Sequence, residues 1–147
     1  MTPPTIQGIH HLKFPVADLD RALAFYAAVF GAIRIAEYDH RDSNGDLYAY
    51  ILSVPNLGTV LELRLNEKLA SLHQGFDPIT LTVGARADLQ SWAAHLDALG
   101  LRHSGVLVGT VGWLLVFEDP DGRRLRLYTR EVHGQEETIS TASEWLA

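Results

Sequence analysis

The stretch HLKFPV, residues 11–16, decides the fold, because its pattern returns as ITLTV at residues 79–83. Apolar side chains alternate with others in both stretches, and this period of two predicts a strand with one buried face. Each stretch precedes an apolar helical stripe. Asp18 is placed to cap the first helix, and Gly31 to end it. Each copy of the stretch therefore predicts a strand followed by a helix.

Three further strands are expected after each helix. In the first half they are joined by the turn SNGD at residues 43–46, which suits a hairpin because Asn-Gly tolerates positive φ angles. In the second half the turn DPDG occupies residues 119–122. The expected strands are residues 33–38, 47–54 and 59–65, and then 101–108, 112–118 and 123–129.

The order strand, helix, strand, strand, strand thus occurs twice, which predicts an α+β fold of two tandem βαβββ modules. The modules span about residues 8–65 and 76–130 of a single domain of 147 residues. The alternative is chance similarity between two α+β segments. Residues 66–75 form the linker, with a short helix near 67–72. Residues 131–147 form a polar tail, in which Trp145 is a candidate anchor.

Composition excludes several classes of protein. The absence of cysteine rules out disulfides, thiolate metal sites and a cysteine nucleophile. A net charge of −6 argues against nucleic acid or an anionic membrane as a partner. Residues 1–8 do not resemble a signal peptide, and no apolar stretch has the length of a membrane span. A soluble cytoplasmic protein is expected.

Alternation places a set of polar side chains on the strand faces that point away from the helices. His11 and Lys13 share such a face in the first strand, as Glu62 does at the end of the first module. Arg126 and Tyr128 are in the matching position of the second module. Two curved sheets that faced each other would enclose these side chains in a cavity, which is the geometry of a site for a small molecule.

Aromatic side chains on the middle strands are candidates for binding the ligand. One row contains Tyr48 and Tyr50, and the other contains Trp113 and Phe117. If either row lines the cavity, the pocket accepts a planar or apolar molecule. The alternative is that the rows pack the modules together.

The sequence resembles the vicinal oxygen chelate superfamily, which includes glyoxalase I, extradiol dioxygenases, fosfomycin-resistance enzymes and bleomycin-binding proteins. The similarity rests on HLKFPV at residues 11–16, DLDRA at 18–22, Phe25-Tyr26, and DPDG at 119–122 before Leu-Arg-Leu. It covers residues 8–130. The resemblance implies a glyoxalase-like fold with a curved mixed-sheet cleft, and a homodimer.

The resemblance also implies four metal-ligand positions, of which two carry a metal-binding side chain. These two are His11 and Glu62. The third position falls on Pro78, which has no side-chain donor, and the fourth on Arg126, whose charge repels a cation. Stable divalent sites normally have at least three protein ligands. No cofactor is therefore expected.

A divalent metal remains an alternative if another side chain supplies a ligand. Asp77 is one residue from the third position, and a shift of one residue turns a side chain to the other face unless a bulge intervenes. Tyr128 is on the expected face but is rarely a ligand. His40 or His73 could reach the site from loops.

Three functions are consistent with these residues and this resemblance. The first is a metal-independent isomerase, cyclase or lyase, in which His11 and Glu62 act as general acid and base and Arg126 stabilises a developing anion. The second is a protein that binds or sequesters a drug-like molecule without chemistry. The third is a metal-dependent enzyme of the glyoxalase or dioxygenase type with a replacement ligand.

Overall fold

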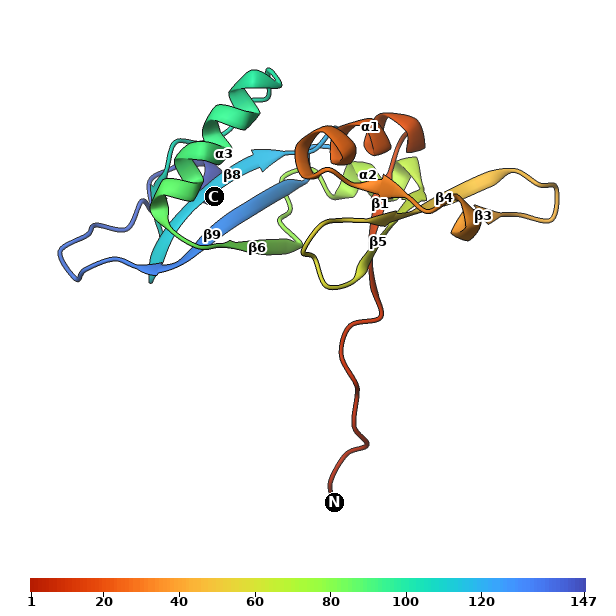
Figure 1. The fold of residues 1–147 in the computed structure, drawn as a ribbon, viewed down its shortest axis with the longest axis horizontal. Helices are drawn as coiled ribbons and strands as arrows, with labels where there is room; N and C mark the ends of the chain where they lie inside the picture. The colour runs from red at the N-terminus through yellow and green to blue at the C-terminus, as the bar shows by residue number, and fades with distance from the viewer. The chain divides into compact units, whose positions relative to one another are not determined.

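The computed structural model describes residues 1–147. The chain forms two compact units, Met1–Ala70 and Ser71–Ala147, and each contains one mixed β-sheet (Figure 1). The predicted α+β class with two mixed sheets is confirmed. None of the helices combines the length and the apolar run that a membrane crossing requires.

The first unit is a sheet with one face covered by a helix. Its strands lie in the order β1-β5-β4-β2, with β3 paired to β4. β1 and β5 are parallel, and β4 is antiparallel to β5. The elements are β1 (His11–Val16), α1 (Leu19–Phe30), β2 (Ile33–Arg34), the 3₁₀ helix η1 (Ala36–Tyr38), β3 (His40–Arg41), β4 (Leu47–Ser53), β5 (Val60–Leu65) and, at the boundary of the units, α2 (Glu67–Leu72).

Helix α1 begins and ends where the sequence predicts. The side chain of Asp18 accepts a hydrogen bond from the backbone N–H of Arg21 at 2.8 Å, and Gly31 ends the helix with φ of 69°. The helix buries Phe25 and Tyr26 against the apolar face of the sheet. The opposite face of β5 is therefore left for polar groups.

The second unit repeats this plan. Its strands lie in the order β6-β9-β8-β7, with β6 parallel to β9 and β8 antiparallel to it. Helix α3 packs on the face that holds the fully buried Leu115 and Phe117. The elements are β6 (Ile79–Val83), α3 (Arg86–Ala98), β7 (Leu107–Val108), β8 (Gly112–Glu118), β9 (Arg124–Val132) and the 3₁₀ helix η2 (Glu144–Leu146).

Two expected strands are wrong in extent. Residues 33–38 form a strand only at Ile33–Arg34, because i to i+3 hydrogen bonds then curl the chain into η1. Residues 101–108 form a strand only at Leu107–Val108. Upstream of it only an isolated bridge joins His103 to Phe117, because the hydroxyl of Ser104, and not a backbone carbonyl, accepts the hydrogen bond from the N–H of Val116 at 2.9 Å.

Other differences are smaller. β9 continues to Val132, three residues beyond the expected end. Leu65 lies at the end of β5 and is exposed. His10 precedes β1 and is exposed. The predicted anchor of the tail is confirmed, because the side chain of Trp145 is 7% exposed.

Candidate acid–base site on the first sheet

Glu62 is a buried carboxylate in the middle of the first sheet. It lies in β5, between Lys13 of β1 and Ile51 of β4. Its neighbours in the strand, Leu61 and Leu63, point into the core beneath α1, so Glu62 points to the opposite face. It is only 2% exposed there. A charged side chain at such depth needs partners to offset the cost of desolvation.

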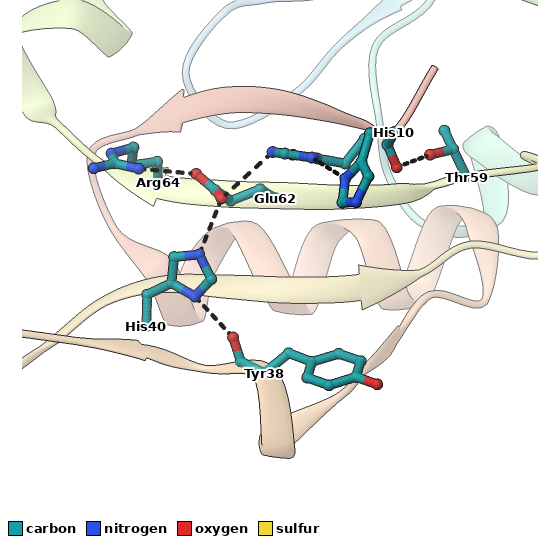
Figure 2. A network of polar contacts seen from close by, with 7 residues as sticks. His10, Tyr38, His40, Thr59, Glu62 and Arg64 are labelled. Carbon is teal, nitrogen blue, oxygen red and sulfur yellow. Dashed lines mark hydrogen bonds and ion pairs between the residues drawn. The ribbon is translucent and has the colours of Figure 1, made fainter. Parts of the chain in front are cut away.

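Three cationic or titratable side chains supply these partners (Figure 2). Nε2 of His40 lies 3.3 Å from Oε1 of Glu62, and Nε2 of His11 lies 3.9 Å from the same oxygen. Nη1 of Arg64 donates to the other oxygen, Oε2, at 3.3 Å. The two oxygens therefore differ, since one binds a permanent cation and the other faces two imidazoles.

The ring of His40 is held in a defined orientation. Its Nδ1 lies 2.8 Å from the carbonyl oxygen of Tyr38 (Figure 2), so Nδ1 carries a proton and donates it. Nε2 then faces Glu62. The ring of Tyr48 packs edge-on against that of His40, with centroids 5.6 Å apart, and the guanidinium of Arg64 lies 5.1 Å from the centre of the Tyr48 ring. Tyr48 thus lies beside the site.

The ring of His11 is held by the histidine that precedes it. Its Nδ1 is 2.9 Å from Nδ1 of His10, so one of the two imidazoles donates to the other. Thr59 fixes this segment, because its hydroxyl donates to the carbonyl oxygen of His10 at 2.7 Å (Figure 2). At 3.9 Å, Nε2 of His11 is too far from Glu62 for a direct hydrogen bond.

An ion pair between Arg34 and Asp39 fixes the segment that carries His40. The guanidinium binds both carboxylate oxygens, with Nε donating to Oδ1 at 2.9 Å. The hydrogen bond to Arg34 lowers the pKa of Asp39, and the same bond raises the pKa of Arg34. Since Asp39 adjoins His40 in the sequence, this pair restrains the imidazole.

Several residues that the sequence grouped in one cavity are elsewhere. The hydroxyl of Tyr50 donates to Asp20 of α1 at 2.8 Å, which raises the pKa of Tyr50 and places it on the helix side of the sheet. Phe117 is fully buried, and Trp113 lies beneath the guanidinium of Arg86 of α3. Tyr50, Trp113 and Phe117 therefore point toward the helices, and of the four aromatic residues only Tyr48 lies beside Glu62.

Arg126 and Tyr128 belong to the second unit. Arg126 forms an ion pair with Asp77. The hydroxyl of Tyr128 accepts hydrogen bonds from the backbone N–H groups of Val111 and Gly112 at 3.0 and 3.1 Å. Lys13 is exposed on β1 of the first unit. Glu62 and Arg126 thus each have charged partners within their own unit.

The sequence suggests His40 only as a replacement metal ligand and does not predict its place beside Glu62 as an acid–base group. One signal could have found it. The hairpin turn that follows puts a short strand at residues 40–41 against β4, and His40 then pairs with Ala49, on the same face as Ile51 and Glu62.

A family model matches residues 8–127, and its description is the Glyoxalase/Bleomycin resistance protein/Dioxygenase superfamily. The chain belongs to this superfamily. The match includes both units and all the strands of their sheets except the end of β9.

Two curated members of the superfamily are similar in sequence. The putative ring-cleaving dioxygenase MhqA of Bacillus subtilis is 28% identical over 130 residues, which are 86% of this chain and 41% of that protein. The metallothiol transferase FosB of Bacillus licheniformis is 28% identical over 141 residues, which are 86% of this chain and 78% of FosB. The chain therefore spans less than half the length of MhqA.

Two solved structures of superfamily members share the fold. A mutant of the fosfomycin resistance protein FosX of Listeria monocytogenes, in complex with Mn(II) and dihydroxypropylphosphonic acid, has a TM-score of 0.69 at 20% identity and covers 85% of this chain and 93% of its own. The antibiotic binding protein TnmS3 of a Streptomyces species has a TM-score of 0.66 at 19% identity, over 88% of this chain and all of its own.

The superfamily's metal positions do not fit a metal ion in this chain. Pro78 and Arg126 provide no ligand atom at two of the four positions. His11, His40 and Glu62 approach one another, but no group of three or more His, Cys, Asp or Glu side chains is arranged to hold a metal. What the site does offer is a carboxylate oxygen that faces two imidazoles.

Proposed function

We propose that the chain is an enzyme that transfers a proton on a small oxygenated molecule and needs no metal ion for that step. Glu62 is the base, and His40 and His11 take up and return protons beside it. The observation that carries this proposal is the geometry at Glu62. Its carboxylate is 2% exposed, and Oε1 lies 3.3 Å from one imidazole and 3.9 Å from another.

The two carboxylate oxygens have separate tasks in this proposal. Arg64 donates to Oε2 and fixes the plane of the carboxylate. Oε1 keeps lone pairs that can accept a proton from a substrate. Because the carboxylate of Glu62 is shielded from water, its interactions with a bound substrate are stronger than they would be in solvent.

The proposed proton transfers are those of an isomerisation or an elimination. Oε1 of Glu62 takes the proton from a carbon next to a carbonyl group, and the electron pair moves onto the carbonyl oxygen as an enolate. In an isomerisation of an α-hydroxy ketone, a protonated imidazole returns a proton to the former carbonyl carbon, and the hydroxyl proton passes to the other oxygen. In an elimination, the imidazole instead protonates the departing oxygen. Glu62 then passes the proton it took to the imidazole, which restores both groups. His40 suits this task, because its Nδ1–H is held by the Tyr38 carbonyl and only Nε2 exchanges protons.

A second candidate is binding without chemistry. The ring of Tyr48, with the Arg64 guanidinium near its face, provides an aromatic and cationic surface beside the polar groups. TnmS3 is an antibiotic binding protein that shares this fold, so a ligand that is bound and left intact is a coherent alternative.

Hydrogen exchange with solvent distinguishes these functions. The protein is incubated in D₂O, with a chelator, with hydroxyacetone, dihydroxyacetone and 2-hydroxyacetophenone, and deuterium at the carbon next to the carbonyl is followed by NMR. The proposal predicts incorporation well above the buffer rate. Binding of these ketones by calorimetry without incorporation supports the second candidate and contradicts the first.

Metal analysis addresses the third function that the sequence left open. Protein purified without chelator is expected to contain less than one divalent ion per two chains. Stoichiometric metal, together with exchange that the chelator abolishes, would contradict the metal-independent step.

A further inference from the structure

The last part of the chain crosses one face of the second sheet. We call residues 133–147 the C-terminal strap. Trp145 is its only buried side chain, and it packs on Leu114 and Val116 of β8, with Tyr128 and Leu146 at the edge of the cluster. Figure 1 shows the end of the chain beside β8. The apolar contact between the strap and the sheet is therefore made mainly by one indole ring.

The face that Trp145 covers is the one opposite α3. Leu114 pairs with Tyr128, and Val116 pairs with Arg126, so these side chains share a face. Alternation puts Leu115 and Phe117 on the other face, beneath the helix. Trp145 thus occupies the polar face on which the sequence placed Arg126 and Tyr128 as ligand contacts.

Two guanidinium groups flank the indole. The carbon at the centre of the Arg102 guanidinium lies 4.6 Å from the ring centre of Trp145, and that of Arg124 lies 5.6 Å from it. Both are within the range of cation–π attraction. An apolar floor with arginines beside it suits a flat aromatic ring.

Arg124 has an unused donor at this place. Its Nε is buried without a hydrogen-bond partner, and the nearest carboxylate oxygen, Oε1 of Glu118, is 3.8 Å away. Its Nη1 donates to the carbonyl oxygen of Ala147 at a long 3.3 Å. A buried N–H donor without an acceptor is costly, and an anion is the natural acceptor for a guanidinium N–H.

Apart from Trp145, the strap is attached by hydrogen bonds and one ion pair. At its start, the backbone N–H of His133 donates to Val111 at 3.0 Å, and Nε2 of His133 lies 2.7 Å from the carbonyl oxygen of Gly109. Ser140 exchanges two hydrogen bonds with Val108, one through its backbone N–H at 2.9 Å and one through its hydroxyl at 3.0 Å. The ion pair between Glu144 and Arg102, 2.7 Å long, is exposed on both sides and so contributes little. Segments with few buried contacts open at low free energy.

We infer that Trp145 occupies a binding site for a planar aromatic carboxylate, and that the strap moves away when such a ligand binds. The ligand's ring takes the place of the indole on Leu114 and Val116. Its carboxylate accepts the hydrogen bond from Nε of Arg124 that no group of the chain accepts. The strap then acts as an internal competitor that sets the apparent affinity.

The effect of the strap on the affinity for a ligand can be calculated. The apparent dissociation constant equals the intrinsic one divided by the fraction of molecules with the site open. If the strap is closed in nine molecules of ten, removing its indole tightens binding by about tenfold.

The test uses indole-3-acetate as the probe and isothermal calorimetry on the full chain. Trp145→Ala is expected to bind it at least about tenfold more tightly than the wild type, by the competition argument above. Indole-3-acetamide, which has no charge, is expected to bind more weakly to the same variant. Trp92→Ala, which removes an indole from α3 on the other side of the sheet, is the control and is expected to bind like the wild type.

A second variant keeps the test informative if Trp145→Ala folds poorly. Glu144→Gln breaks only the exposed ion pair, leaves Leu114, Val116 and both arginines in place, and is expected to tighten binding of the acetate by a smaller factor. In the wild type, saturating acetate is expected to speed hydrogen exchange at the amides of Ser140 and Leu146, which donate to the carbonyl oxygens of Val108 and Ser143 when the strap is closed.

The inference is overturned if neither variant binds the acetate more tightly than the wild type, if the acetamide binds as well as the acetate, or if the strap amides stay protected in the complex. It does not depend on the function proposed for Glu62. A loss of proton transfer in Glu62 variants leaves these titrations unchanged.

Discussion

Nε2 of His40 lies closer to Oε1 of Glu62 than Nε2 of His11 does, at 3.3 Å against 3.9 Å. His40 comes from β3, a strand of two residues, and its Nδ1 is fixed by the Tyr38 carbonyl. The imidazole nearer the base is therefore the better placed proton donor.

The first prediction compares the two histidines in the exchange assay. His40→Ala is expected to lower the rate of deuterium incorporation by about a hundredfold, since a positioned acid or base typically contributes a factor of that order. His11→Ala is expected to lower it less. Added imidazole is expected to restore part of the activity of His40→Ala. His95→Ala, which removes an exposed histidine of α3, is the control, and equal losses in all three variants would count against the assignment.

The second prediction concerns the segment that carries His40. Asp39→Asn removes the charge that pairs with Arg34 and is expected to reduce the free energy of unfolding by about 1 to 3 kcal/mol at pH 7, because a hydrogen bond between charged groups is lost. The pKa of Asp39 is lowered by Arg34, so this stabilisation is present above the carboxyl's unfolded pKa and disappears as the pH falls through the folded one. Urea unfolding of the wild type and the variant at pH 7 and pH 3 measures the difference in their free energies of unfolding. A difference as large at pH 3 as at pH 7 would contradict this role of Asp39.

The third prediction concerns His73. Nδ1 of His73 accepts a hydrogen bond from Nε of the buried Arg123 at 3.1 Å, and burial together with the charge of Arg123 lowers the pKa of His73. Below about pH 6.5 the unfolded chain therefore binds a proton that the folded chain does not, and stability falls as the pH falls, with a slope of at most about 1.4 kcal/mol per pH unit. His73→Gln is expected to lose this pH dependence of stability between pH 6.5 and the lowered pKa of His73. If the free energies of unfolding of wild type and variant depend on pH in the same way, the prediction is wrong.

The fourth prediction tests what the hydroxyl of Tyr128 does. Because it accepts two backbone hydrogen bonds from the turn before β8, Tyr128→Phe is expected to reduce stability by about 1 to 3 kcal/mol, the cost of donors left without a partner. Thermal unfolding measures this loss. A variant as stable as the wild type would show that the hydroxyl is free to serve a ligand instead.

The sequence predicts those elements whose signals are local. Helix α1 follows from the Asp18 cap and the Gly31 stop, and α2 and β8 fall on the expected residues. Residues 33–38 could not be predicted correctly, because their conformation depends on the ion pair between Arg34 and Asp39 and on η1, which no alternation pattern reveals.

The candidate site is predicted in part for the same reason. His11 and Glu62 follow from alternation on neighbouring parallel strands. The approach of His40 depends on a register shift between His40 and Arg41, which a single sequence does not display. Trp145 is recognisable as an anchor, but its position on the Leu114 face comes from tertiary packing. The homodimer and the cytoplasmic location stay predictions.

The most direct test of the central claim is the exchange rate of Glu62→Gln, measured in D₂O with chelator on the α-hydroxy ketone that the wild type exchanges fastest. Glutamine keeps the shape of the side chain and removes its basicity. The account predicts a loss of about a hundredfold or more, in the range typical of a general base, with the fold intact by circular dichroism. Glu67→Gln, which alters an exposed glutamate of α2, is the matched control and is expected to retain full activity. Exchange by folded Glu62→Gln at the wild-type rate would contradict the claim that this carboxylate is the base.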